Sequence, residues 1–212
     1  MPTPTWQIRA AQQSDIPALH ALIEASIRGL QADDYTPAQI EGALGTVLGL
    51  DTQLIRDQTY FVVEASQSDQ LEASDNSPQP LAYPQPERLP TPGRPVLAGC
   101  GGWSKRKTLF GSDGASVREP ELLNPATDAA KVRAIFVHPD FARRGLGSLI
   151  LAHVEAAAQA AGFHHFEMGS TLTGVPLYRL KGYVEAERIA VPLPNGEALP
   201  IVKMIKPAIQ RN

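Results

Sequence analysis

The sequence predicts a mixed α/β fold in which a sheet of six or seven strands is flanked by helices. Along the 212 residues, apolar runs of strand length alternate with segments whose apolar residues recur at helical spacing. The pair Asn195-Gly196 lies between two strand-like segments and is typical of a hairpin turn. Apolar residues make up 43% of the chain and charged residues 19%, as in ordinary globular domains.

The N-terminal part predicts two strands and two helices. Thr5–Ala10 is a short strand candidate. Apolar residues at helical spacing predict a helix over Ser14–Gly29, with Ser14 as its cap. A second helix is expected over Thr36–Leu48, because a threonine followed by proline commonly begins a helix. Thr59–Ala65 contains four consecutive apolar or aromatic residues and predicts a buried strand.

The C-terminal part predicts further strands and two helices. The expected strands are Pro95–Lys107, Val132–His138, Phe163–Met168, Tyr183–Pro192 and Ala198–Lys206. A helix is expected over Gly145–Ala161, since its apolar residues repeat at helical spacing and Gly162 follows as a stop. Pro176–Lys181 predicts a short helix.

One segment interrupts this alternation. Seven of the 19 prolines fall between Pro78 and Pro95, and Ser66–Arg94 is also rich in Ser, Gln and Asp. Such a composition buries too little apolar surface to offset the entropy of ordering. We therefore expect residues 1–212 to form a single domain with a flexible insertion at 66–94; an ordered lid over a site is the alternative.

Composition also narrows the class of protein. The net charge of −3 argues against a nucleic-acid binder, and the single cysteine, Cys100, excludes an internal disulfide framework and a multi-cysteine metal site. No metal site is expected. Met1–Asp15 lacks the apolar stretch of a signal peptide, and polar residues interrupt Leu146–Phe163, so no membrane span is predicted. A cytoplasmic protein is the expectation.

The most informative motif lies between a predicted strand and a predicted helix. Arg143-Arg144-Gly145-Leu146-Gly147-Ser148 places two glycines where the backbone must turn and a helix begins. Free N–H groups and the positive end of the helix dipole make such a junction suitable for a phosphate. A simple packing turn is the alternative. The chain has no GxxxxGK[ST] motif, and Ile150 stands where a dinucleotide-binding GxGxxG motif needs glycine.

These residues resemble a known family. Val132–Ser148 is similar to motif A of the GNAT N-acetyltransferase superfamily, whose [Gln/Arg]-x-x-Gly-x-[Gly/Ala] signature aligns with residues 142–147. Ala142 departs from the first position of that signature. Pro176–Tyr183 resembles the tyrosine motif of the family, and the first strand and helix and the closing hairpin are also similar, over roughly residues 5–65 and 95–207.

The resemblance implies a mostly antiparallel sheet and transfer of an acetyl group from acetyl-CoA to a small-molecule or peptide amine, with homodimers common among relatives. The thioester would enter where the fourth and fifth strands separate. The implied cofactor-binding residues are Ile135, Phe136 and Val137 for the pantetheine arm, Arg143, Arg144, Gly145, Leu146, Gly147 and Ser148 for the pyrophosphate, and Thr171, where many relatives carry Asn.

Tyr178 is the candidate catalytic residue, because the resemblance implies that it protonates the departing thiolate. A packed core tyrosine is the alternative, and packing is also expected for Tyr183. No general base can be assigned: Lys131 and Phe166 occupy the two positions where relatives carry glutamate. Glu167 should face the opposite side of the sheet from Phe166. The remaining titratable candidates are His138, His164 and His165.

Other readings stay open. The missing carboxylate and Ala142 fit a catalytically impaired acyl-CoA-binding sensor, and the glycine loop could instead serve an ATP-binding protein. Lys105–Lys107 could meet the 3′-phosphate of CoA, although a solvated turn is favoured. Asp33–Tyr35 could shape an acceptor pocket or form a polar loop, and Cys100 is expected to pack as a small apolar residue.

Overall fold

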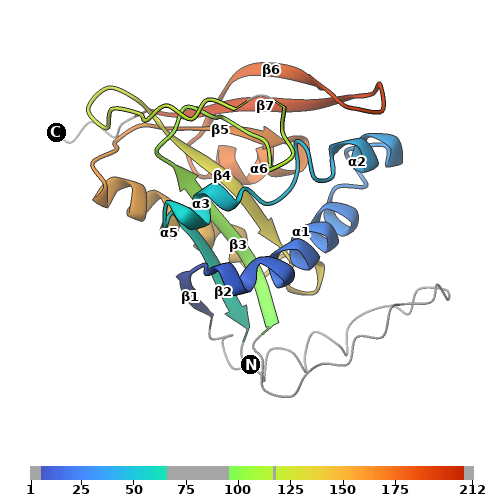
Figure 1. Ribbon diagram of the computed structural model, residues 1–212, viewed down its shortest axis with the longest axis horizontal. Helices are drawn as coiled ribbons and strands as arrows, with labels where there is room; N and C mark the ends of the chain where they lie inside the picture. Colours follow the sequence, from blue (N-terminus) through green and yellow to red (C-terminus); the bar gives the residue numbers. More distant parts are fainter. Residues whose placement is uncertain (1–5, 66–95, 117, 208–212) are drawn as a thin grey trace.

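The computed structural model describes residues 6–65, 96–116 and 118–207. The expected insertion at Ser66–Arg94 lies outside these residues, so a single domain with a flexible insertion stays a prediction. The described residues form a mixed α/β fold around one seven-stranded sheet (Figure 1), as predicted. Among them, none of the helices has the length and apolar character needed to cross a bilayer.

The strands, in chain order, are β1 Gln7–Ala10, β2 Tyr60–Ala65, β3 Val96–Ser104, β4 Ala130–Val137, β5 Phe166–Thr171, β6 Val184–Pro192 and β7 Ala198–Lys206. The helices are α1 Ile16–Leu30, α2 Pro37–Ala43, α3 Thr52–Arg56, α5 Leu146–Ala160 and α6 Val175–Leu180. Three short 3₁₀ turns lie at Gln13–Asp15, Pro139–Phe141 and Leu172–Gly174.

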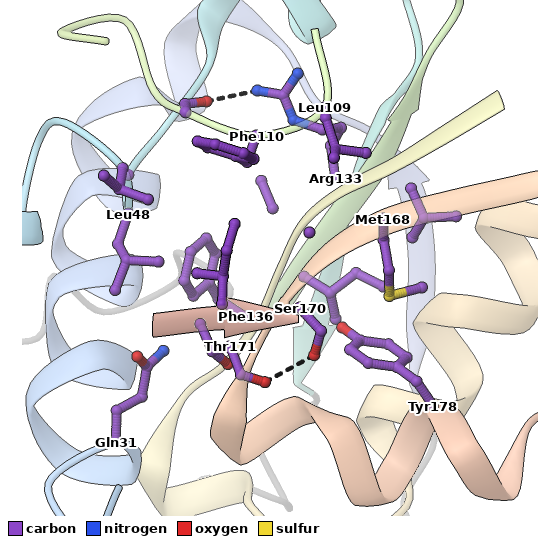
Figure 2. Close-up of a pocket in the computed structure, with 18 residues that line it drawn as sticks. Gln31, Leu48, Leu109, Phe110, Arg133, Phe136, Met168, Ser170, Thr171 and Tyr178 are labelled. Carbon is purple, nitrogen blue, oxygen red and sulfur yellow. Dashed lines mark hydrogen bonds between the residues drawn. The ribbon is translucent and has the colours of Figure 1, made fainter. Parts of the chain in front are cut away.

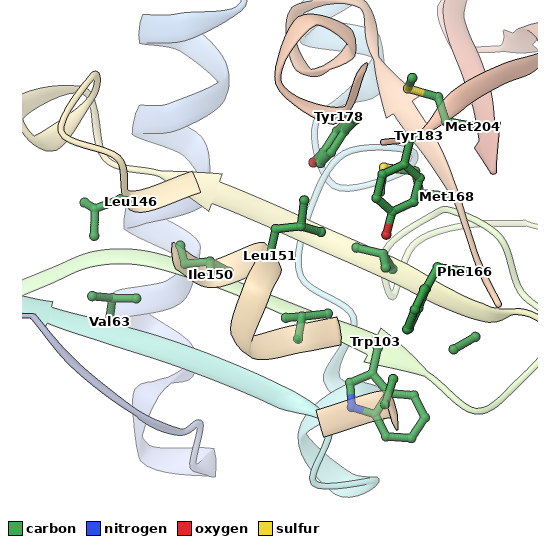
Figure 3. Packing of buried hydrophobic residues seen from close by; sticks show 14 of the residues in the cluster. Val63, Trp103, Leu146, Ile150, Leu151, Phe166, Met168, Tyr178, Tyr183 and Met204 are labelled. Carbon is green, nitrogen blue, oxygen red and sulfur yellow. The ribbon is translucent and has the colours of Figure 1, made fainter. Parts of the chain in front are cut away.

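The sheet has the order β1-β2-β3-β4-β5-β7-β6, and only the β4–β5 pair is parallel. Helices α1, α2 and α3 contribute to the core on one face, and α5 and α6 to the core on the other. Figure 3 shows Leu146, Ile150 and Leu151 of α5 in the second core, together with Trp103 and Phe166. The sheet is thus buried on both faces over its centre.

Strand β4 departs from regular geometry in its middle. Ala134 has a φ of 51°, and the register against β3 shifts between Cys100 and Gly102, which is a β-bulge. The Tyr60 hydroxyl donates to the Ala134 carbonyl over 2.9 Å and lies 3.2 Å from the Cys100 sulfur. The bulge is therefore held by a buried hydrogen bond.

Strands β4 and β5 pair over only two positions, Ala130 with Phe166 and Lys131 with Glu167. Beyond these two positions, β5 is paired only with β7 on its other side, and β4 only with β3. Only the starts of the two strands are therefore paired, and the site described below lies between their later residues.

Several boundaries differ from the sequence-based expectation. Ser14 is not the helix cap, because it lies inside the 3₁₀ turn that Gln12 begins and that the Asp15 carboxylate closes by accepting the Gln12 N–H at 2.8 Å. The second helix starts directly after Thr36, as predicted, and the Thr36 side chain caps it. It ends at Ala43 instead of Leu48, because the chain becomes extended at Leu44 and turns through the left-handed Gly45.

Strand β5 begins at Phe166 rather than Phe163, because Phe163 first packs into the core directly after the helix-ending Gly162, whose φ is 92°. Helix α3 was not predicted, although its cap, Asp51, is a residue type that favours helix starts. The Asn195-Gly196 hairpin turn between β6 and β7 is confirmed.

Candidate functional site

A cavity of about 80 Å³ lies where β4 and β5 separate. Its walls come from β4 residues 132–136, β5 residues 168–171, the start of the α1–α2 connection, the 47–49 loop and the 109–111 loop. Figure 2 shows Phe136, Met168 and Tyr178 around this space, with Phe110 on another wall. With Tyr178 of α6 and Ile201 of β7, the cavity is assembled from seven separate parts of the sequence.

The cavity brings together four of the residues singled out from sequence. Ile135 and Phe136 line it from β4, Thr171 from the end of β5, and Tyr178 from α6. Val137 is not among the described lining residues, because it follows the bulge and packs against the α5 core. Residues 143–148 lie beyond β4, at the start of α5.

Tyr178 is buried, with 9% of its surface exposed. Its hydroxyl has no hydrogen bond to any residue in the part of the chain that the structure describes, and burial raises its pKa to about 12. Gly174 makes room for the ring, since a Cβ there would lie 2.7 Å from a Tyr178 ring carbon and 2.9 Å from the Ser170 hydroxyl. The result is a protonated phenol at the cavity wall, with no hydrogen-bond partner in the described part of the chain.

Tyr183 has a different environment although its ring packs against Tyr178 with centroids 6.0 Å apart. Its hydroxyl donates to the Glu155 carboxylate over 2.8 Å, and Lys206 contacts the same carboxylate at 2.8 Å. Burial, followed by the charge of Glu155, raises the Tyr183 pKa well above its usual range. Tyr183 thus packs as expected and does not line the cavity.

The start of α5 has the geometry of an anion site. Gly145 is its N-cap with a φ of 82°, and among the residues that the structure describes no side chain caps the first amides of the helix. A Cβ on Gly145 would meet no atom within 4 Å, so the space beside the Cα of this N-cap residue is open. Leu146 is buried in the core, so its backbone alone can face a ligand. Gly147 lies against α6, since its Cβ would be 3.0 Å from Leu177.

Positive charge accompanies this helix start. Arg143 is exposed, with a φ of 63°, and Ser148 is partly exposed. The Arg144 guanidinium lies over the Phe141 ring at 5.7 Å from the centroid. His138 contacts Asp140 through its ring, whereas His164 and His165 are exposed near the start of β5. None of the three histidines is among the described residues that line the cavity.

Arg133 was not singled out from sequence, yet it holds one wall of the cavity. Its side chain is almost fully buried and donates to the Thr108 carbonyl at 2.8 Å, to the Gly111 carbonyl, and to Asp51 at 3.1 Å. Asp51 also accepts from Arg118 at 2.9 Å. The sequence held one sign of this role: Arg133 is a charged residue within an otherwise apolar strand. A buried charge requires hydrogen-bond or ion-pair partners, so such a residue is expected to hold neighbouring segments in place.

Gln31 is a second residue that the sequence did not reveal. It ends α1, is only 6% exposed and lines the cavity. Its side-chain oxygen is buried without a hydrogen-bond partner among the residues that the structure describes. Figure 2 shows its amide directed toward the interior, below Leu48. A polar group of this kind is available to a ligand or a water molecule.

Among the described residues that line the cavity, none carries a carboxylate that could act as a general base. Lys131 is paired with Glu167, which also contacts Lys203 at 3.1 Å. Glu167 faces away from Phe166, as predicted. Burial alone would raise the pKa of its carboxyl, but the two lysines together have the larger effect and lower it. The described residues lining the cavity include neither a carboxylate nor a histidine. Nor do three or more His, Cys, Asp or Glu side chains gather into a metal-binding group within the described ranges.

Three lesser candidates are also placed. Arg106 follows β3 and pairs with Asp57 at 2.8 Å. Ser104, the last residue of β3, lies opposite Lys131 near the start of β4. Lys105–Lys107 therefore lie at the opposite end of β4 from the 143–148 loop. Tyr35 is buried and hydrogen-bonded to both Pro200 and Leu172. Cys100 is buried, and burial raises its pKa to about 12, as fits a packed residue.

A family model described as an acetyltransferase (GNAT) domain matches residues 123–192. This span contains β4, the 143–148 loop, α5, β5, α6 and β6. Over this span the chain is thus similar to a GNAT acetyltransferase domain. A comparison with curated proteins finds no match.

Solved structures show the same GNAT fold. A GCN5-related N-acetyltransferase from Rhodopseudomonas palustris has 20% identity and a TM-score of 0.60, with 99% of each chain covered. The PaiA N-acetyltransferase of Thermoplasma acidophilum, solved with coenzyme A, has 10% identity and a TM-score of 0.54, covering 96% of this chain and 99% of that one. The ribosomal-protein-S18-alanine N-acetyltransferase of Escherichia coli has 14% identity and a TM-score of 0.52, covering 98% and 97%. The family match and these neighbours support acetyl transfer in general.

Proposed function

We propose that this GNAT protein transfers an acetyl group from acetyl-CoA to a primary amine, with Tyr178 as the general acid. The observation that carries the proposal is the Tyr178 hydroxyl, which lies at the cavity between β4 and β5 without a hydrogen-bond partner among the described residues. The coenzyme A complex of a structural neighbour supports the choice of acetyl-CoA. Bound acetyl-CoA would supply an activated acetyl thioester.

The chain offers two matching surfaces for that molecule. The open, uncapped amides at residues 145–148, with Arg143 and Arg144 beside them, suit the pyrophosphate. Backbone groups of Ile135, Phe136 and Val137 are proposed for the pantetheine arm, and Thr171 for a polar contact at the end of β5. A backbone N–H aimed at the developing oxyanion contributes typically a few kcal/mol.

Tyr178 then holds the proton that the departing thiolate needs. A pKa of about 12 keeps its hydroxyl protonated at neutral pH. As the new C–N bond forms and the C–S bond breaks, the hydroxyl gives its proton to sulfur and regains one from the acceptor nitrogen through solvent. Because a thiol has a pKa of about 8.5, the sulfur needs protonation only as it leaves.

The absence of a carboxylate from the described cavity wall bears on the acceptor. At pH 7, deprotonating a lysine amine with a pKa near 10.4 costs about 4.6 kcal/mol, whereas an α-amine with a pKa near 8 costs about 1.4 kcal/mol. We therefore propose an acceptor amine of lowered pKa, such as an α-amine. The same absence favours one other candidate function, an acyl-CoA-binding sensor without catalysis.

Calorimetric titration of acetyl-CoA into the wild type and two variants tests the cofactor. Gly145→Glu adds a side chain and a negative charge in front of the α5 amides and should abolish binding. Gly196→Glu is a matched control, because Gly196 also has a positive φ, 85°, with no atom within 4 Å of a Cβ, but lies in the β6–β7 turn. It should bind as the wild type does.

Absence of binding to the folded wild type would contradict the proposal. Binding without acetylation of any amine in a broad panel would instead favour the sensor. Equal loss of binding in both variants would assign the effect to backbone strain and not to the α5 site.

A further inference from the structure

A second cavity of about 550 Å³ adjoins the candidate site. One side is formed by the C-terminal half of β6 and the turn after it, residues 189–194. The other side is formed by residues 46–47 and by the 110–116 loop. We call this cavity the β6 groove. Its volume lies within the roughly 300–1,000 Å³ of small-molecule sites.

The β6 groove has an apolar lining. Ile189, Val191 and Leu193 contribute from the strand side, and Val47 and Phe110 from the opposite side. None of the described residues that line it carries a charge. A charged group placed there would lose hydration without gaining a counter-charge, whereas an apolar group would gain from leaving water.

The β6 groove and the cavity between β4 and β5 share a wall. Val47, Phe110 and Gly111 line both. The Phe110 ring lies over Gly169 of β5, where a Cβ would approach a Phe110 ring carbon to 3.1 Å. Arg133 holds the same loop by donating to the Gly111 carbonyl. The wall between the two spaces is thus fixed from β4 and from β5.

We propose that the β6 groove binds an uncharged, apolar substituent of the acceptor, so that the preferred substrates are amines carrying such a group. This inference rests on the proposed acetyltransferase function. An acceptor whose substituent lies in the β6 groove has only the Val47–Phe110 wall between that substituent and the cavity that Tyr178 lines. The substituent would thus lie directly beside the cavity at which the thioester is proposed to react.

A series of amino-acid amides tests this, because their α-amines are alike and only the side chain varies. Glycinamide, alaninamide, norvalinamide and norleucinamide lengthen an apolar chain, while lysinamide and glutamic acid α-amide carry charge. Each buried methylene is worth about 0.8 kcal/mol, which corresponds to about fourfold in affinity or in kcat/KM. Both properties are measured: kcat/KM by release of free thiol, and calorimetric binding of each N-acetylated amide to the CoA-loaded protein.

Val191→Asp places a charge in the β6 groove and should reduce the gain from alaninamide to norleucinamide at least about tenfold, while glycinamide changes little. Val184→Asp is the matched control, since Val184 lies in the same strand, is 53% exposed and does not line the β6 groove. It should keep the full gain. If Val191→Asp does not fold, Val191→Ser replaces it, with a smaller reduction expected.

The outcomes separate the inference from the function on which it rests. Binding that strengthens with chain length and weakens in the Val191 variant supports the apolar site, even if no amide is acetylated and the proposed function fails. Acetylation of the amides with no dependence on chain length, or with preference for the charged ones, overturns the inference and leaves the proposed function standing. Absence of chain-length dependence in binding overturns it whatever the turnover.

Discussion

Two neighbouring tyrosines in one core allow a direct test of which hydroxyl takes part in catalysis. The rings of Tyr178 and Tyr183 are 6.0 Å apart and both are buried. The Tyr183 hydroxyl donates to Glu155 over 2.8 Å, whereas the Tyr178 hydroxyl has no partner among the described residues. Removing the Tyr178 hydroxyl should therefore lower activity with little change in stability, whereas removing the Tyr183 hydroxyl should lower stability with little change in activity.

Tyr178→Phe removes no hydrogen bond, so the free energy of unfolding should stay within about 1 kcal/mol of the wild-type value or rise, as an unpaired polar group is lost. Loss of a general acid should lower kcat by about 10²–10⁴-fold. The KM for acetyl-CoA should remain within about twofold, because the hydroxyl acts on the leaving group and not on the ground state.

Tyr183→Phe removes a hydrogen bond to a carboxylate, which is worth about 1.5–3 kcal/mol. For a chain of this size, each kcal/mol shifts the melting temperature by about 2–4 °C, so a fall of about 3–12 °C is expected. Its kcat should stay within about threefold of the wild type, since Tyr183 does not line the cavity.

Steady-state kinetics by thiol release and thermal unfolding by circular dichroism measure both variants side by side. The reasoning is refuted if Tyr178→Phe keeps more than half of the wild-type kcat. It is also refuted if Tyr178→Phe melts as early as Tyr183→Phe, because the lost activity would then report a lost packing interaction.

Three further predictions concern polar groups around the site. Gln31→Met removes a buried oxygen that lacks a described partner and should raise the free energy of unfolding by about 1–3 kcal/mol in urea; a lower value would mean that a water or the backbone satisfies it. Arg133→Met breaks a buried ion pair with Asp51 and should cost about 3–5 kcal/mol in the same assay, and a loss below 1 kcal/mol would contradict this. Lys131 and Lys203 lower the pKa of Glu167, so the stability from these two ion pairs is present above the unfolded pKa of about 4.3 and is lost as pH falls. The melting temperatures of wild type and Glu167→Gln should therefore differ at pH 7 and converge near pH 3. A difference that stays constant with pH would count against the pairing.

Local chemistry explains which parts of the fold could be predicted. Thr36 and Gly162 marked helix ends because each acts on the adjacent backbone: a capping side chain in one case and a left-handed glycine in the other. Asn195-Gly196 likewise determined its own turn. The central strands β2, β3 and β4 followed from apolar runs because the centre of this sheet is buried on both faces.

The rest depended on contacts between distant residues. Nothing near Ala134 indicates a bulge, since the hydrogen bond that holds it comes from Tyr60, 74 positions away. Gln31 and Phe110 meet at the cavity only through the packing of loops against the sheet. The motifs thus indicated Ile135, Phe136, Thr171 and Tyr178, which all line the cavity. They gave no sign of Gln31, Phe110 or Arg133, which complete its walls.

The topology brings these motifs together. A parallel β4–β5 pair requires a crossover, and α5 provides it, so the α5 N-terminus must lie at the carboxyl end of β4. Strand β5 then pairs with β7 in antiparallel register and leaves β4 after two paired positions. The change from parallel to antiparallel pairing therefore places a cavity and an open helix start at the same edge of the sheet, as ligand sites at strand switch points require. Extending the β4–β5 pairing past Lys131 would close the cavity even if Tyr178 and Gly145 were unchanged.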